Sequence, residues 1–221
     1  MIVVPAPLEA HTLVFETELK LLSSFYPRFQ IDIADGIFVP NTTIQISDLS
    51  HLCTLAKPET IFDFHLMVQD PIKHIDLLKN IRGIVLGIIF IHKSVFPDYS
   101  LTTNHYPLFK FGLVLSPEDE VNSIDSELIN ALLSIQIMTV SPGFQGSPFI
   151  EKSLIKIEQL RKRGYKGEIL IDGAVSEKTL PIILSKLYKP DVLGVGSYLT
   201  KSPKDELERR VGYLKRAIYN L

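Results

Sequence analysis

The pattern of apolar and polar positions divides the chain into short strand-like runs that alternate with longer amphipathic stretches. The short runs are rich in isoleucine, valine, leucine and phenylalanine, which is typical of strands buried in a parallel sheet. They predict eight strands, at Ile2–Val4, Phe29–Ile33, Ile61–Leu66, Ile84–Phe90, Phe109–Leu115, Ile135–Val140, Glu168–Ile171 and Val192–Val195.

Three of the amphipathic stretches predict helices most clearly, namely Phe149–Arg163, Glu177–Leu187 and Lys204–Asn220. The first has Ser147 as its expected N-cap and Pro148 in its first turn, and Gly164 follows its basic end. The helical periodicity between residues 94 and 107 is weaker. Helices therefore fall between the strands along the whole chain.

This alternation of strand and helix predicts an α/β fold, a closed (β/α)8 barrel made by one domain of residues 1–221. An open doubly wound sheet is the alternative. That fold would carry a glycine-rich dinucleotide fingerprint after its first strand, and the sequence has none there.

The composition of the chain bears on its cellular compartment and on the partners it can bind. The chain of 221 residues has a net charge of −2, from 23 basic and 25 acidic residues, and no basic block that would favour nucleic acid or an anionic membrane. Its single cysteine, Cys53, excludes an internal disulfide framework. The proline-broken N-terminus does not resemble a secretory signal. We therefore expect a cytoplasmic protein, and we expect it to form a homo-oligomer.

The segment "QIDIADG" (30–36) places an acid on a buried strand. Strand alternation puts Ile31 and Ile33 on one face and Asp32 on the other. In "FDFHLMV" the same rule puts His65 on the polar face, and Asp172 ends the seventh strand. In a barrel, side chains at the carboxyl ends of strands line the active site. We therefore expect Asp32, His65 and Asp172 to meet at one mouth.

Glycine-rich segments follow the last three predicted strands. They are "SPGFQGSPF" (141–149), "DGA" (172–174) and "GVGS" (194–197). Glycine lets backbone N–H groups approach an anion closely, and barrel loops near strands seven and eight frequently bind phosphate. The pattern predicts a phosphate cradle made mainly of backbone amides, because no lysine or arginine lies within these segments.

At these residues the chain resembles the ribulose-phosphate 3-epimerases over nearly its whole length. The resemblance is carried by "IDIADGIFVPN" (31–41), "FDFHLMV" (62–68), "GLVLSP" (112–117), "IMTVSPGFQGSPFI" (137–150), "IDGAV" (171–175) and "GVGS" (194–197). It implies a TIM barrel of the ribulose-phosphate-binding type and an isomerase of the pentose phosphate pathway. Such an enzyme interconverts ribulose 5-phosphate and xylulose 5-phosphate, small sugar phosphates.

The resemblance also implies roles for particular residues. Asp32 and Asp172 would be the proton-transferring acids, and with His65 they would hold a divalent metal ion such as zinc, manganese, iron or cobalt. Met67 and Met138 would line the pocket around the reacting carbons. The positions implied in substrate or phosphate binding are His65, Gly143, Phe144, Gln145, Gly146, Gly173, Ala174, Gly196 and Ser197.

Several residues depart from the family pattern. Gln30 stands where the family has its other metal-binding histidine, which implies a metal site that is altered, weak or absent. Ala34 replaces a pocket methionine, Ala6 replaces a substrate-contacting serine, and Ala174 replaces a glycine. On the fourth strand, either His92 or Ile91 takes a histidine position of the family.

These features leave two main hypotheses and a weaker third. The first is a divergent sugar-phosphate 3-epimerase, in which Asp32 removes a proton next to a carbonyl and Asp172 returns one to the opposite face. The second is a non-catalytic relative that binds a phosphorylated ligand. A barrel lyase would need a lysine at the mouth, for which Lys93 is the single candidate found.

Overall fold

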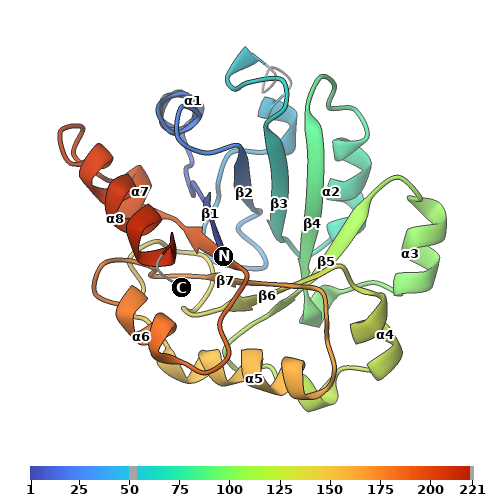
Figure 1. Ribbon diagram of the computed structural model, residues 1–221. Coiled ribbons are helices and arrows are strands. Elements are labelled where there is room, and N and C mark those ends of the chain that lie inside the picture. Colours follow the sequence, from blue (N-terminus) through green and yellow to red (C-terminus); the bar gives the residue numbers. More distant parts are fainter. Residues whose placement is uncertain (50–53, 220–221) are drawn as a thin grey trace.

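The computed structural model describes residues 1–49 and 54–219, and Cys53 lies outside this part of the chain. Eight parallel strands form one sheet at the centre of the molecule (Figure 1). They are β1 (Ile2–Pro5), β2 (Arg28–Ala34), β3 (Ile61–Met67), β4 (Val85–His92), β5 (Lys110–Leu115), β6 (Ser134–Met138), β7 (Glu168–Asp172) and β8 (Val192–Val195). Every strand expected from the sequence is present. The sixth is shorter than expected because Thr139 and Val140 already belong to the following loop.

The sheet curls into a nearly closed (β/α)8 barrel, as the alternation predicted. Hydrogen-bonded neighbours run β1-β8-β7-β6-β5-β4-β3-β2, so β1 and β2 are its two edges. These edges lie next to each other, with no hydrogen-bonded register between them among the described residues. We call this junction the seam. The barrel closes there through the proximity of β1 and β2, without a backbone ladder among the described residues.

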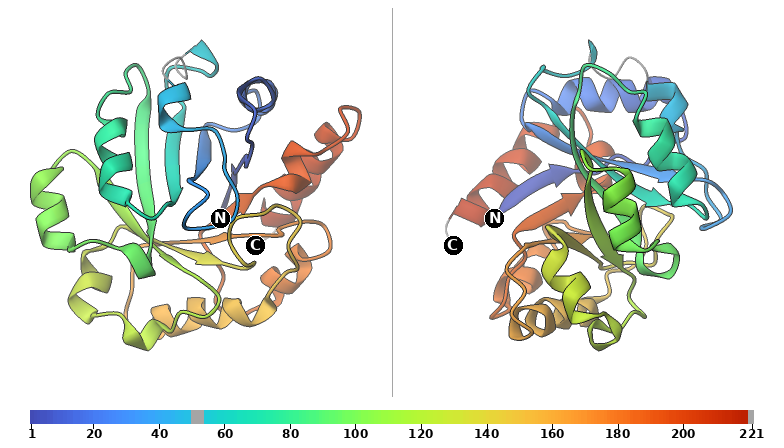
Figure 2. Two further views of the ribbon diagram at one scale, coloured as in Figure 1. Left: turned by 180° about the vertical axis from the view of Figure 1, so that it is seen from behind. Right: turned by 90° about the vertical axis from the view of Figure 1, so that its right-hand side faces the viewer.

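Helices surround the barrel (Figures 1 and 2). The α-helices are α1 (Thr12–Leu22), α2 (Pro71–Leu78), α3 (Tyr99–His105), α4 (Ser126–Ala131), α5 (Ile155–Lys162), α6 (Leu180–Ser185), α7 (Ser197–Thr200) and α8 (Leu207–Tyr219). Short 3₁₀ segments are η1 (Ile46–Leu49), η3 (Lys93–Val95), η4 (Val121–Ser123) and η5 (Glu151–Leu154). No described helix has the length and apolar character needed to span a membrane.

The three helices that were predicted most clearly are shorter than expected. The first begins at Glu151, because the Ile150 N–H donates to the Thr139 carbonyl at 2.7 Å and keeps the preceding residues extended. Ser147 is not its N-cap, since its hydroxyl donates to the Phe144 carbonyl inside a loop. Gly164 does end the helix, at a φ of +87° that favours glycine.

The other two predicted helices begin later than expected, and α6 also ends earlier, at Ser185, while Asn220 lies outside the described residues. Ser176 and Thr179 form a hydrogen-bonded turn before α6, which therefore starts at Leu180 rather than at residue 177. A turn in which the Glu206 N–H donates to the Pro203 carbonyl precedes α8 and moves its start to Leu207. The weakly periodic segment forms η3 and α3.

The core has an outer and an inner layer. Strand side chains that face outward pack against the helices and make the large core, with Ile31, Ile33 and Ile171 fully buried. Inward-facing side chains fill the barrel itself, in a cluster that consists of Val4, Phe90, Val114, Met138, Val140, Leu170 and Val192. This filling makes the barrel a solid core, so that a ligand can enter only at a mouth.

An ion-pair network closes the amino-terminal end of the barrel. Arg28 donates from Nε to Asp63 Oδ2 at 2.6 Å and from both Nη atoms to Glu168, at 2.8 and 2.9 Å. The other Asp63 oxygen accepts the N–H of Ile88 at 2.8 Å, where the β3–β4 register shifts. A Cβ at Gly87 would lie 2.1 Å from Asp63 Oδ1, so the shift requires glycine there. Asp63 therefore belongs to this network rather than to the mouth.

Candidate functional site

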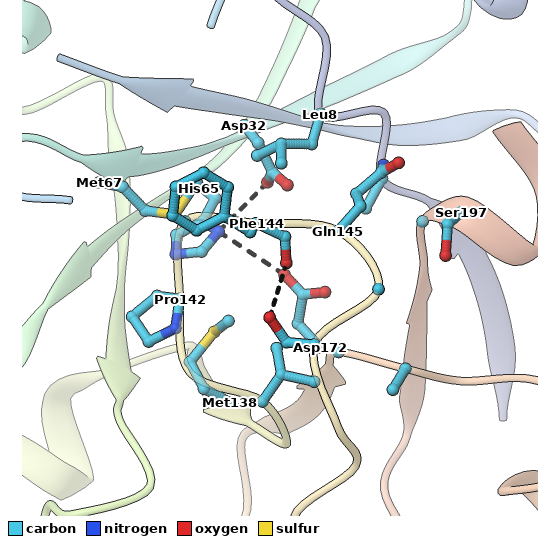
Figure 3. Close-up of a pocket in the computed structure, with 18 of the residues that line it drawn as sticks. Leu8, Asp32, His65, Met67, Met138, Pro142, Phe144, Gln145, Asp172 and Ser197 are labelled. Atoms are coloured by element: carbon cyan, nitrogen blue, oxygen red, sulfur yellow. Dashed lines mark hydrogen bonds and ion pairs between the residues drawn. The ribbon is translucent and has the colours of Figure 1, made fainter. Parts of the chain in front are cut away.

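One pocket opens at the carboxyl ends of the strands (Figure 3). Most residues that the sequence placed in the site line this pocket, whereas Gln30, Ala34 and His92 lie outside its lining. Those that line it are Ala6, Asp32, His65, Met67, Met138, Gly143, Phe144, Gln145, Gly146, Asp172, Gly173, Ala174, Gly196 and Ser197. The remaining lining residues are Leu8, Val140, Pro142, Ser147 and Val175, of which Pro142 and Ser147 belong to the glycine-rich segment 141–149. Lys93 does not line the pocket, and its ammonium pairs with Asp119 at 3.5 Å.

Two carboxylates and an imidazole meet on the floor of the pocket. His65 Nδ1 lies 3.2 Å from Asp32 Oδ1 and 3.6 Å from Asp172 Oδ2 (Figure 3). The three ligand atoms lie within 4.8 Å of one another, and all three residues are buried. Strand alternation on β2, β3 and β7 turns each side chain inward, so the expected convergence of these residues is confirmed.

Gln30 lies two residues before Asp32 on β2 and contacts the same two carboxylates from the barrel interior. Its Nε2 donates to Asp172 Oδ2 at 2.7 Å and to Asp32 Oδ1 at 3.0 Å. It thus bridges the two acids with N–H groups, which stabilise negative charge. Its Oε1 is buried and, within the part of the chain that the structure describes, has no hydrogen-bond partner.

A second glutamine, which sequence reasoning missed, lies beside the first. Gln136 on β6 donates from Nε2 to Asp172 Oδ2 at 3.0 Å, and this nitrogen lies 3.3 Å from His65 Nδ1. The residue is fully buried. The signal was present, because a polar residue between Ile135 and Ile137 in a buried strand must face the barrel interior.

Histidine 92 extends the polar network on the other side of His65. The two Nε2 atoms are 2.9 Å apart, and His92 Nδ1 lies 3.3 Å from the Ser116 hydroxyl. The Phe38 ring packs on His92, with the ring centroids 4.7 Å apart. The question left open for β4 is thereby settled, since His92 faces the site while Ile91 packs in the outer core.

Burial changes the acid–base properties of two of these groups. Burial and the nearby Asp32 carboxylate together raise the pKa of Asp172 from 3.8 to about 6, although His65 and the Gln30 hydrogen bond oppose this shift. Burial also lowers the pKa of His92 well below its usual value, because the charged imidazolium would lie in the core beside His65. Asp172 can therefore hold a proton at a pH where an exposed aspartate is ionised.

The donor set of Asp32, His65 and Asp172 fits a divalent transition metal ion. Two carboxylate oxygens and an imidazole nitrogen are ligands that zinc, manganese, iron and cobalt accept. Gln30 turns N–H groups toward the carboxylates, and an N–H donor cannot ligate a cation. The structure thus presents three protein ligands.

The three glycine-rich loops form one wall of the pocket. The backbone N–H groups of Phe144, Gly146, Ala174 and Ser197 have no acceptor among the described residues. Gly173 requires glycine, since its φ is +120° and an added Cβ would lie 2.5 Å from Val140. Ala174 keeps a φ of +53°, so the methyl group has not forced this backbone out of the left-handed region.

Comparison with known proteins identifies the family. A family model described as the ribulose-phosphate 3 epimerase family matches residues 3–199. The chain is 30% identical over 163 residues to a ribulose-phosphate 3-epimerase of Bacillus subtilis, an alignment that spans 70% of this chain and 71% of the relative. It is 29% identical over 194 residues to the enzyme of that name from Methanocaldococcus jannaschii, spanning 86% and 78%.

A solved structure supports the fold alone. Tryptophan synthase of Mycobacterium tuberculosis superposes with a TM-score of 0.64 at 11% identity, covering 98% of this chain and 91% of that one. The fold and the sequence relatives therefore agree. The chain belongs to the ribulose-phosphate 3-epimerase family, with its acid pair and His65 at the mouth of the barrel.

Proposed function

We propose that this protein is a sugar-phosphate 3-epimerase that interconverts ribulose 5-phosphate and xylulose 5-phosphate, or a related ketose phosphate. The observation that carries the proposal is the buried pair Asp32 and Asp172, with His65 between them, in a pocket walled by loops with free backbone amides. Epimerisation next to a carbonyl needs a base and an acid on opposite faces of one carbon.

The two carboxyl groups divide this work. Asp32 takes the proton from carbon 3 and leaves an enediolate, and Asp172 returns a proton to the opposite face. Burial favours this assignment, because a pKa of about 6 lets Asp172 hold a proton at pH values where an exposed aspartate is ionised. In the reverse reaction the two exchange roles. The amides of Gln30 and Gln136 hold Asp172 in place through hydrogen bonds of 2.7 and 3.0 Å.

A divalent cation would be held by Asp32, His65 and Asp172, and when bound it supplies Lewis-acid stabilisation of the negative charge on the enediolate. Zinc, manganese, iron and cobalt are the candidates. Because Gln30 offers no ligand in the observed geometry, we expect weaker binding than at a four-ligand site.

The glycine-rich loops would bind the phosphate of the substrate. The free N–H groups of Phe144, Gly146, Ala174 and Ser197 line one pocket and would donate to its oxygens. Gln145 adds a side-chain amide whose nitrogen and oxygen have no partner among the described residues. Ala6, Met67 and Met138 would contact the carbon chain of the sugar.

Residues 1–221 act as one domain in this proposal, since pairing of β1 with β8 joins the two ends of the chain in one sheet. We expect the protein to work in the cytoplasm as a homo-oligomer. Size-exclusion chromatography with light scattering tests the oligomeric state.

An epimerase assay with solvent deuterium tests the function. The wild type should convert ribulose 5-phosphate and incorporate deuterium at carbon 3. Asp32→Asn and Asp172→Asn should each lower turnover ~10²-fold or more, the usual scale for general acid–base groups. Asp76→Asn, which changes an exposed acid on α2, is the matched control and should leave turnover unchanged. Phosphate-dependent binding without proton exchange on any ketose phosphate would instead favour a non-catalytic relative.

A further inference from the structure

Gln136 makes contacts that a structural core residue does not need. Its Nε2 lies 3.0 Å from Asp172 Oδ2, 3.3 Å from His65 Nδ1 and 3.5 Å from Met138 Sδ. An amide nitrogen has two hydrogens, so one can be directed to the carboxylate while the other faces the imidazole. The side chain therefore connects two of the three groups on the pocket floor.

The oxygen of the same amide argues against a purely stabilising role. Gln136 Oε1 is buried, and within the described residues nothing donates a hydrogen bond to it. An unsatisfied buried acceptor lowers stability, and an apolar side chain of the same shape would avoid that loss. The side chain thus contributes its two donors to the site and leaves its oxygen unsatisfied.

Gln30 and Gln136 together form a chain of amide bridges. Gln30 links Asp32 to Asp172, and Gln136 links Asp172 to His65. The resulting order is Asp32, Gln30, Asp172, Gln136, His65, so each functional side chain is held to its neighbour by a buried amide. Asp172 accepts from both glutamines at the same oxygen.

We propose that Gln136 is a positioning residue that holds Asp172 and His65 at a fixed separation. This inference rests on the proposed function for its catalytic consequence, but its geometric part concerns these side chains alone. Without the bridge, Asp172 keeps the Gln30 hydrogen bond and can rotate about it, so its carboxyl oxygen no longer stays on the reacting face. The phosphate loops are untouched by this rotation.

Replacing Gln136 with methionine tests the proposal, because Gln136→Met keeps the length of the side chain and removes both donors. We expect kcat to fall about tenfold or more, the usual effect of losing a group that orients ligands at such sites. The KM for the sugar phosphate should stay within about twofold, because Gln136 donates to the Asp172 side chain and to none of the loop amides that would bind phosphate. Gln136→Glu also keeps the shape and replaces the donors with acceptors, so it should lose more activity than the methionine variant.

A readout that needs no turnover separates this inference from the proposed function. The affinity for Mn²⁺ of the chelator-treated full chain should fall about tenfold in Gln136→Met, since Asp172 and His65 both move. If the wild type has no epimerase activity, the proposed function fails while this comparison still tests the bridge. Ser134→Ala, two residues earlier on the same face of β6, is the control and should leave kcat and Mn²⁺ affinity unchanged.

Two outcomes would overturn the proposal. One is a folded Gln136→Met variant with wild-type kcat and wild-type Mn²⁺ affinity. The other is a variant whose only change is a lower melting temperature, because that result would assign Gln136 a structural role.

Discussion

Replacing Arg28 with methionine should lower the stability of the protein, because Arg28 neutralises the buried carboxylate of Asp63. The Asp63 carboxylate is completely inaccessible to solvent, and Arg28 Nε at 2.6 Å is its cationic partner. Among the described residues, the other oxygen of Asp63 accepts one hydrogen bond, from the Ile88 N–H. With Arg28 gone, the buried carboxylate has lost its counter-charge, so the carboxyl group should take up a proton when the protein folds.

The loss of stability can be estimated from the free energy needed to protonate Asp63. Burial raises the pKa of Asp63, and Arg28 opposes the shift, so the pKa should rise further in the variant. An unfolded aspartate has a pKa of about 3.9, and each pH unit above it costs about 1.4 kcal/mol to protonate. The upper bound on the loss is therefore about 4 kcal/mol at pH 7 and about 1.5 kcal/mol at pH 5. Because the folded-state pKa lies above the unfolded one, the loss grows as pH rises.

Urea unfolding of the wild type and Arg28→Met at pH 5, 6 and 7 measures this difference. At pH 7 this upper bound corresponds to a fall in melting temperature of at most roughly 8–16 °C, at 2–4 °C per kcal/mol for a chain of this length. Adding Asp63→Asn to Arg28→Met should remove the pH dependence, because no buried carboxyl remains to be protonated. Arg209→Met removes an exposed arginine on α8 and should show no such dependence. A stability difference between Arg28→Met and the wild type that is equal at pH 5 and pH 7 would refute the reasoning.

Three further predictions concern the site and its surroundings. Gln30→His should tighten zinc binding, because residue 30 already contacts both carboxylates, and equal affinity in a zinc titration would show that it does not reach the ion. Gly196→Asp should abolish sugar-phosphate binding by calorimetry with the fold intact, since the new Cβ would lie 3.3 Å from Gln145 Nε2; unchanged affinity would reduce the loops to simple turns. Burial and the neighbouring Glu9 raise the pKa of Glu18 from 4.5 to about 8, so the folded state holds this proton more tightly than the unfolded state does. The free energy of unfolding therefore falls as pH rises from 4.5 to 8. Glu18→Gln should accordingly gain stability over the wild type between pH 5 and pH 8 in urea unfolding, and a constant difference would contradict this sign.

The strands and the acid pair could be predicted from the sequence because both depend on local periodicity. Alternation on one strand determines which side chains face the barrel interior, and the strand ends determine which of those reach the mouth. Asp32, His65 and Asp172 follow from this rule alone. Asp63 obeys the same alternation but lies at the other end of the barrel, where Arg28 neutralises it. The role of Asp63 therefore depends on its position along the strand, which is near the amino-terminal end of the barrel and away from the mouth.

The helix starts and the polar partners could not be predicted in the same way. The start of the helix near residue 150 depends on a hydrogen bond from the Ile150 N–H to Thr139, a contact between a loop and its own strand end. The role of Gln136 depends on Asp172 and His65, which come from strands 36 and 71 residues away. A polar residue in a buried strand shows that a partner exists, and only the register of distant strands identifies it.

The seam between β1 and β2 is a junction at which the barrel can open locally. Hydrogen-bonded ladders join all the remaining pairs of neighbouring strands. Among the described residues, the seam is therefore the one junction at which two strands can separate without breaking a backbone ladder. Ala6 follows β1, and Asp32 lies near the end of β2, so each side of the seam contributes a residue to the pocket. Local opening of such a junction is a low-energy motion compared with global unfolding. An opening of the barrel between β1 and β2 is therefore expected to move Ala6 relative to Asp32 while the seven hydrogen-bonded strand pairs stay intact.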